Sequence, residues 1–308
     1  MSQDSSFFII LSSAVAVLAL LVFGLSAWNL RQPHPLRALI NRWARWFLFS
    51  LVGAFILDQF TDGTRPFAVW WAISFLAWFL GESILTWMAV KSLSFSQFPL
   101  FPRFEVPPED STLPADAEFL HLRDELKKAG FSRKQSLRAD LPHGLRVQLL
   151  VYLSDDQRHK LQVFLIPHPT GAMLTCFSLF SKNDEGEHWV TDNIFLPFGG
   201  FYPSRWKLQR FPLRRTFSSI LAIHQRRLKQ AGGNWVAWDE EWLSSINEEQ
   251  RHIENLNEKA GLILPHSYRE EYGLLSTEGR YRLWKEIWLL NYFATPVNYR
   301  PPQTLDSQ

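Results

Sequence analysis

The sequence of 308 residues contains a single cysteine, Cys176. One cysteine excludes an intramolecular disulfide framework and a multi-cysteine zinc site. The nine histidines are scattered without metal-ligand spacing, and the motifs GxSxG and HExxH are absent. We therefore expect no metal, no cofactor and no catalytic residue that a motif can identify. An enzymatic function is left open, with a non-enzymatic one favoured.

Charge is scarce in the N-terminal third of the chain. Residues 7–28 form an uncharged run that would span about 30 Å as a helix, which is the thickness of a bilayer core. Two further apolar runs, 46–60 and 66–90, flank the turn sequence TDGTRP. We expect a transmembrane region over residues 1–92 with about three spans, in a multi-pass integral membrane protein. A re-entrant pair, or one buried and one interfacial helix, is the alternative for the second and third runs.

The distribution of positive charge predicts an orientation. The connection after the first run contains four arginines, whereas the second connection contains only Arg65; the four are Arg31, Arg37, Arg42 and Arg45. Because positive charge favours the cytoplasmic side, the first connection should be cytoplasmic. Three spans would then place the N-terminus outside and the C-terminal domain in the cytoplasm, in a cell inner membrane. Two spans would leave both termini on one side.

Two acidic residues, Asp58 and Glu82, fall inside or near these runs. An ionised carboxylate is costly in hydrocarbon, so each should lie at the interface, be paired or be protonated. We interpret Asp58 as an interfacial residue. Glu82 lies deeper, and a place at the interface, a role in an ion path or pairing with a partner helix would account for it.

The rest of the chain has the composition of a folded, mixed-charge domain. We divide it into a linker rich in Pro and Phe over 93–113, an α+β domain over 114–233, a helical extension over 234–294 and a disordered tail over 295–308. The fold class is therefore a membrane-anchored α+β protein.

Strand and helix signals alternate in this domain. Four β-like runs, separated by turn sequences, predict an antiparallel sheet of three to four strands with helices on one face; they are 145–153, 160–167, 173–181 and 189–196. Caps and periodicity predict helices over 114–129, 213–230, 239–260 and 278–293. The last of these is apolar nearly all round, so it needs burial in a core, at a partner or against a bilayer.

Acidic residues are absent from 201–233, and this absence is the strongest charge signal in the chain. The same stretch contains eight cations: Arg205, Lys207, Arg210, Arg214, Arg215, Arg226, Arg227 and Lys229. Anionic lipid headgroups would be the expected ligand of a tethered cytoplasmic domain. Neutralisation within the chain, by the acids of the helix at 239–260, is the competing interpretation. Nucleic acid or another phosphate ligand is disfavoured.

Three functions follow as hypotheses. The first is a membrane-anchored cytoplasmic interaction module that contacts the lipid bilayer and anionic headgroups. The second is an accessory subunit of a membrane complex, in which Glu82 pairs with a membrane protein partner or with a second copy. The third is a membrane-associated enzyme with a site near His168, Asp192 and the Gly199-Gly200 loop, which has β-turn composition and lacks the residues of a phosphate loop.

Overall fold

The computed structural model describes residues 2–61, 64–107, 117–167, 173–297 and 299–301. The chain forms two compact units. The first, here called the helical unit, comprises Met1–Ser92 and Ile287–Ala294. The second, the α+β unit, comprises Leu93–Glu286 and Thr295–Gln308. His168 and most of the predicted tail lie outside the described residues.

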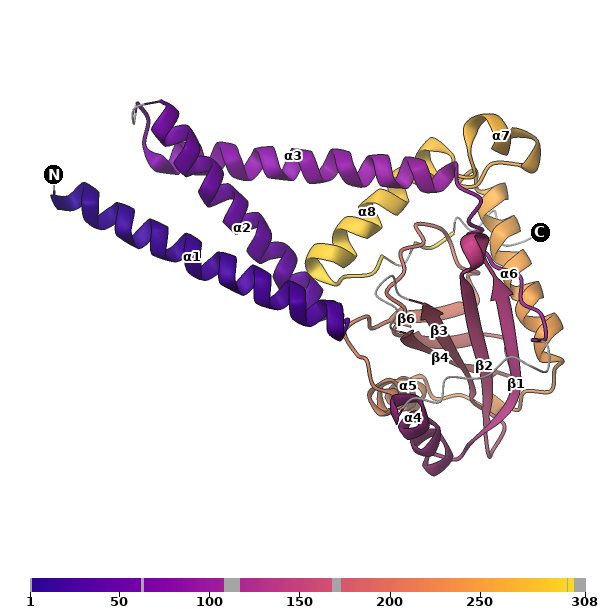
Figure 1. The fold of residues 1–308 in the computed structure, drawn as a ribbon. Helices are drawn as coiled ribbons and strands as arrows, with labels where there is room; N and C mark the ends of the chain where they lie inside the picture. Colours follow the sequence, from indigo (N-terminus) through magenta and orange to yellow (C-terminus); the bar gives the residue numbers. More distant parts are fainter. Residues whose placement is uncertain (1, 62–63, 108–116, 168–172, 298, 302–308) are drawn as a thin grey trace. The chain divides into compact units, whose positions relative to one another are not determined.

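The helical unit begins with three helices, α1 (Ser2–Arg31), α2 (Pro35–Phe60) and α3 (Phe67–Ser94) (Figure 1). Two of them are long and apolar enough to cross a membrane, α1 over Ile9–Arg31 and α3 over Phe67–Ser94, a finding that rests on length and composition alone. The predicted second span is the apolar end of α2. That helix starts at a proline and has arginines in its first turns, so it does not meet the same criterion.

Aromatic side chains hold the helical unit together. The Trp46 ring on α2 stacks on Phe75 of α3, with 4.7 Å between the ring centroids, and meets Tyr292 edge-on at 5.2 Å. The indole nitrogen of Trp43 donates to the Tyr292 carbonyl over 2.8 Å. Tyr292 belongs to the last helix, α8 (Thr277–Phe293). The second half of α8 therefore packs on α2 through Trp288 and Tyr292, while Phe293 at its end is 59% exposed, so the burial expected from its sequence is met only in part.

A single mixed sheet of seven strands forms the centre of the α+β unit. The strands follow each other in space in the order β1-β2-β3-β4-β5-β6, while β7 pairs with β4. All neighbours are antiparallel except β5 and β6, which are parallel. The strands are β1 (Phe131–Asp140), β2 (Arg146–Ser154), β3 (Lys160–Pro167), β4 (Met173–Asn183), β5 (His188–Asp192), β6 (Trp206–Arg210) and β7 (Trp235–Val236).

The expectation of three to four antiparallel strands is therefore wrong in number and in direction. The four β-like runs correspond to β2, β3, β4 and β5, whereas the sequence pattern predicts none of β1, β6 and β7. The β1 sequence, FSRKQSLRAD, is highly charged, which is possible because β1 is an edge strand with one face in solvent. The β6 segment is short and basic, and a long connection from β5 brings it alongside β5 in the same direction.

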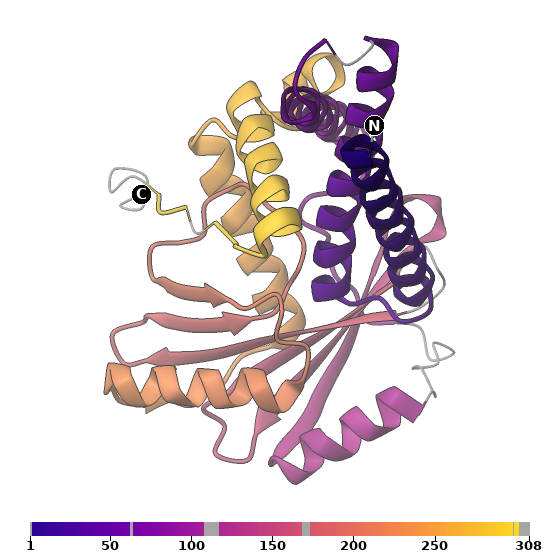
Figure 2. The same ribbon diagram turned by 90° about the vertical axis from the view of Figure 1, so that its left-hand side faces the viewer.

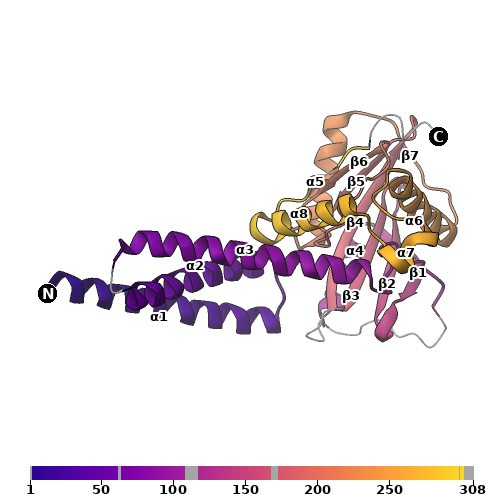
Figure 3. The ribbon, with the colours of Figure 1, turned by 90° about the horizontal axis from the view of Figure 1, so that it is seen from above.

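Helices cover both faces of the sheet, not one (Figure 2). On one face, α4 (Ala117–Lys128) and α5 (Phe217–Ala231) pack through Leu126 and Ile220 onto Leu150 and Leu161. On the other face, Ile246 of α6 (Trp242–Lys259) packs against Leu149 and Val151. The two helices α5 and α6 lie on opposite sides of the strands in Figure 3. Consecutive residues at the end of β2 are all buried, without the alternation of buried and exposed side chains that a strand with one solvent face would show. This pattern is expected of a strand covered on both faces.

The connection between β5 and β6 packs closely against the first half of α8. Gly199 adopts a left-handed φ of 71°, and a Cβ atom there would lie 2.6 Å from the backbone nitrogen of Leu283. The Gly199-Gly200 segment is therefore a structural turn that only glycine fits well. Beyond it, Phe201 forms a parallel bridge with Tyr299, in the segment predicted as a tail.

Candidate ligand-binding pocket

The basic stretch does not form one exposed surface. Arg210 ends β6 and is only 9% exposed. Its guanidinium binds both oxygens of Asp192, at 2.8 and 3.1 Å, and donates to the Tyr202 hydroxyl over 3.0 Å. Glu286 of α8 lies 3.9 Å from the same guanidinium. Arg210 is thus the centre of a buried ion-pair network.

Arg227 is also buried and holds the last two strands of the path together. Its guanidinium donates to the carbonyl of Val190 and the hydroxyl of Thr191 on β5, and to the carbonyl of Lys207 on β6. Burial lowers the pKa of Arg227 to about 10, so the side chain is still charged at neutral pH. Its role here is structural.

The other six cations of the stretch are spread over several surfaces. Lys207 pairs with Glu187 over 3.0 Å, and Arg215 donates to the carbonyl of Thr175 over 2.8 Å. Arg205 lines the pocket described below. The exposed remainder is Arg214, Arg226 and Lys229. Lys207 and Arg210, the two cations of this stretch with ion pairs among the described residues, pair with Glu187, Asp192 and Glu286, and none of these acids belongs to α6.

The two acids of the membrane runs have different surroundings. Glu82 on α3 lies 3.9 Å from Arg45 of α2, so it has a cationic neighbour within the helical unit. Asp58 lies in the last turn of α2, where its carbonyl accepts from Thr61. The presence of Arg45 weakens the argument that Glu82 requires a partner helix from another protein.

The region named for an enzymatic site is filled by structural hydrogen bonds. Asp192 is 2% exposed and bound to Arg210. The backbone nitrogens of Phe198 and Gly199 both donate to the buried carboxylate of Glu286. Burial raises the pKa of Glu286. These groups do not line a cleft together among the described residues.

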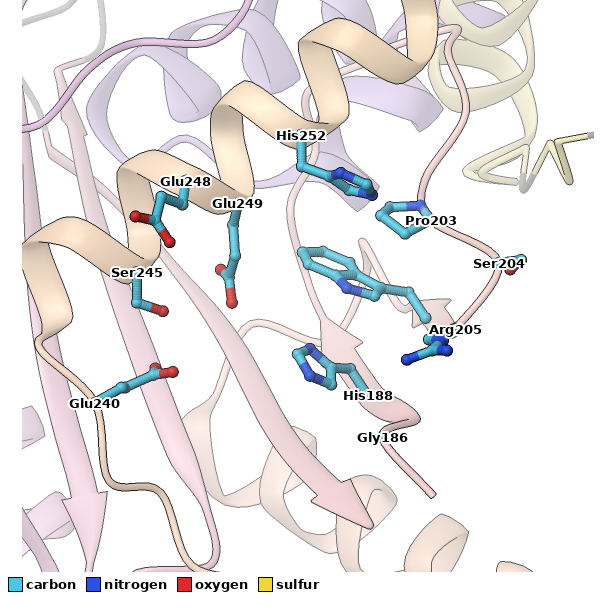
Figure 4. Close-up of a pocket in the computed structure, with 11 residues that line it drawn as sticks. Gly186, His188, Pro203, Ser204, Arg205, Glu240, Ser245, Glu248, Glu249 and His252 are labelled. Carbon is cyan, nitrogen blue, oxygen red and sulfur yellow. The ribbon is translucent and has the colours of Figure 1, made fainter. Parts of the chain in front are cut away.

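A pocket of about 620 Å³ opens elsewhere, between α6 and the β5–β6 side of the sheet (Figure 4). One wall, here called the acidic wall, presents Glu240, Ser245, Glu248 and Glu249. The opposite wall, here called the aromatic wall, presents His188 and Pro203, with Arg205 and Ser204 beside them and His252 of α6 above. Trp206 belongs to this wall because it lines the pocket and stacks on the His188 ring. Gly186 completes the lining.

The acidic wall is anchored by a fully buried lysine. The Lys160 ammonium lies 3.0 Å from Oε1 of Glu240 and 3.1 Å from Oε1 of Glu249. It also sits over the Trp238 ring, 4.2 Å from the centroid. Burial raises the pKa of Glu249, an effect that the neighbouring lysine opposes. The lysine side chain itself is 0% exposed, so it positions the two carboxylates without lining the pocket.

The aromatic wall contains a neutral histidine. Burial, reinforced by the charge of Lys160, lowers the pKa of His188 to about 4. The His188 ring stacks on Trp206 with 6.1 Å between centroids and meets Trp238 edge-on at 5.6 Å. At neutral pH this wall therefore offers apolar surface and uncharged polar groups, next to the single cation Arg205.

A second polar network lies on the α5 side of the sheet. His224 is 0% exposed, and its two ring nitrogens lie 2.9 Å from the Ser181 hydroxyl and 2.8 Å from the Thr191 hydroxyl. Ser181 in turn lies 2.7 Å from Nδ1 of His159. Burial lowers the pKa of His224 to about 3. Because Ser181 is also 0% exposed, these groups stabilise the interior and do not form a nucleophilic site.

The pocket is suited to binding. It combines hydrogen-bond acceptors with an aromatic surface, and its volume lies in the range of about 300 to 1,000 Å³ that is usual for small-ligand sites. Among the described residues, no group of three or more His, Cys, Asp or Glu could hold a metal ion.

Sequence reasoning missed this site, although half of it leaves a sequence signal. Ser245, Glu248, Glu249 and His252 are spaced three, four and seven positions apart and so share one helix face. The aromatic wall depends on β6 and its parallel pairing with β5, which the sequence pattern does not predict.

Comparison with protein-family models, with curated proteins and with solved structures finds no match to this chain.

Proposed function

We propose that the protein is a membrane-anchored binding module, in which apolar helices hold the chain in a bilayer and the α+β unit binds a small ligand between the acidic and aromatic walls. The observation that carries the proposal is the convergence of three carboxylates and a tryptophan on one pocket of about 620 Å³. The long apolar helices α1 and α3 support the membrane anchor.

Binding can be tested through the indole signal of Trp206. We suggest nitrogen-15 labelling of tryptophan in the full chain in detergent micelles, with the Trp206 signal assigned from a Trp206→Phe variant. Four probes with the same alkyl chain are n-butylammonium, n-butylguanidinium, butyrate and n-butanol. Saturable shifts of the Trp206 signal with at least one probe are expected. If none of the four shifts it up to the solubility limit, the binding proposal is wrong.

Two controls make this test specific. Trp189 packs on Trp235 and under the guanidinium of Arg227, away from the pocket lining, so its signal should not move. Ser245→Phe fills the pocket and should abolish the shift, whereas Ser267→Phe makes the same change at an exposed site outside the lining and should preserve it.

Contact with anionic headgroups stays a separate proposal for the three exposed cations, Arg214, Arg226 and Lys229. Arg210 and Arg227 are used inside the fold. Replacing the three exposed residues with Glu should reduce photo-crosslinking to phosphatidylserine in nanodiscs, and unchanged crosslinking would contradict the proposal.

A further inference from the structure

The walls of the pocket have an excess of negative charge. Three carboxylates, Glu240, Glu248 and Glu249, line it, whereas Arg205 is the lining cation and Lys160 lies behind the wall. His188 and His252 complete the titratable groups of the lining, and His188 is neutral at pH 7 because burial and Lys160 lower its pKa to about 4. The lining glutamates therefore outnumber the lining cation by two, whereas Lys160 and Lys182 lie over the Trp238 ring outside the lining. Electrostatic interactions in a partly enclosed space are stronger than in bulk water.

The protein already binds one ammonium group with the same chemistry. Lys160 uses Oε1 of Glu240, Oε1 of Glu249 and the faces of two aromatic rings, Trp238 and Phe180. Both carboxylates also line the pocket, beside Glu248. Glu248 is exposed and takes part in neither contact of Lys160. Its Oε1 accepts from the Ser244 hydroxyl over 3.4 Å, a neutral partner that leaves the negative charge of Glu248 to a ligand.

The opposite wall suits an uncharged alkyl or aromatic portion. His188 and Pro203 face the carboxylates across the pocket (Figure 4), and Trp206 lines the pocket stacked on the His188 ring. A ligand that spans the pocket would thus place a cation against the acidic wall and its carbon skeleton against Trp206. The volume admits a small molecule rather than a folded partner.

We propose that the pocket binds a small organic cation, a primary amine or a guanidine, through Glu240, Glu248 and Glu249, with Trp206 packing on the carbon skeleton. This inference rests on the proposed function, because it names the ligand class of the same pocket. Anions are disfavoured, since a carboxylate or phosphate would meet three like charges at short range.

The four probes separate the two proposals. Butylammonium and butylguanidinium should shift the Trp206 signal with an affinity at least about tenfold higher than butyrate or butanol, which corresponds to about 1.4 kcal/mol. If butyrate or butanol binds as tightly as the cations, the cation inference is wrong while the binding module stands. If no probe binds, both proposals fail.

A charge-neutral variant tests the role of the acidic wall. Glu248→Gln removes one charge without touching the Lys160 contacts, and it should weaken butylammonium about threefold or more while leaving butanol unchanged. Glu270→Gln is the matched control, because Glu270 is exposed on α7 (Arg269–Tyr272) and does not line the pocket. Equal affinity of Glu248→Gln and the wild type for butylammonium would overturn the assignment.

Discussion

At the scale of single residues, the interior of the α+β unit is unusually polar, and its charges and histidines are held by specific partners. His224 can be assigned a tautomer from its neighbours. Arg227 donates to the Thr191 oxygen; in the neutral form of His224, the Thr191 hydroxyl then donates to Nδ1 and Nε2 donates to Ser181. In this arrangement the hydrogens of Arg227, Thr191 and His224 each have an acceptor. Nδ1 of His224 carries no proton, so His224 is neutral.

The neutral state of His224 predicts a loss of stability in acid. Its pKa is about 3 in the folded chain and 6.5 in the unfolded one, so the unfolded state binds more protons between these values and acid favours unfolding. Between pH 7 and pH 5 the loss from this residue should be about 2 kcal/mol. The measurement is the melting temperature in detergent as a function of pH.

A substitution isolates this contribution from other titrating groups. The lowered pKa values of His159 and His188 add the same slope, whereas the raised pKa values of Glu249 and Glu286 oppose it. The His224→Gln variant should therefore lose less of its melting temperature on acidification than the wild type. Parallel pH profiles for the two proteins would show that His224 does not contribute.

The sequence does not predict which cations of the 201–233 stretch are buried. A run of cations without acids suggested an exposed basic surface, but Arg210 and Arg227 point into the fold. The missing information was strand register: Asp192 and Arg210 are direct neighbours across β5 and β6. No local pattern reveals a buried ion pair whose two members come from strands that pair across a long connection.

At the scale of elements, local signals predicted the helices well. The turn at Gly130, with its φ of 77°, follows the basic last turn of α4, as expected of a helix stop. The start of α6 differs from the predicted residue 239, since the helix begins at Trp242 and Glu241 caps it, accepting from the backbone nitrogens of Leu243 and Ser244. Strands were harder, because β1 and β6 depend on pairing partners rather than on their own hydrophobic pattern.

Close packing of α2 on α3 supplies a prediction at this scale. A Cβ atom at Gly53 would lie 2.8 Å from the Ser74 hydroxyl of α3, whereas a Cβ at Gly81 would meet nothing within 4 Å. Gly53→Leu should therefore force the two helices apart and cost about 2 kcal/mol. Gly81→Leu makes the same exchange in an open position and should be neutral or slightly stabilising, because leucine has the higher helix propensity.

The measurement is the melting temperature of the two variants and of the wild type in the same detergent. A clear decrease for Gly53→Leu, with no decrease for Gly81→Leu, is the expected pattern. Equal effects at both positions would mean that the α2–α3 contact does not limit the stability of the helical unit.

At the scale of the whole molecule, the proposed orientation depends on whether α2 crosses the bilayer. Gln32 lies between α1 and α2, Thr64 between α2 and α3, and Ser267 in the α+β unit; all three are exposed. Three spans with an outside N-terminus would place Gln32 and Ser267 in the cytoplasm and Thr64 outside. If α2 lies in the interface instead, Gln32 and Thr64 would be on the same side.

Single cysteines at these positions, in a Cys176→Ser background, allow a direct measurement. A membrane-impermeant maleimide added to intact cells should label Thr64→Cys only, and the same reagent added to inverted vesicles should label Gln32→Cys and Ser267→Cys. Labelling of Gln32→Cys and Thr64→Cys from one side would exclude three spans.

The contacts of α8 with the N-terminal helices form late in synthesis of the chain. Residues 287–294 complete the aromatic cluster around Trp43 and Trp46, yet the ribosome synthesises them only after the whole sheet. Until residues 287–294 have been synthesised, the N-terminal helices therefore lack the contacts that these residues make with Trp43 and Trp46. A chain that stops before residue 287 would lack this packing however well its sheet had folded, so the aromatic contacts of α2 form only in chains that include the second half of α8.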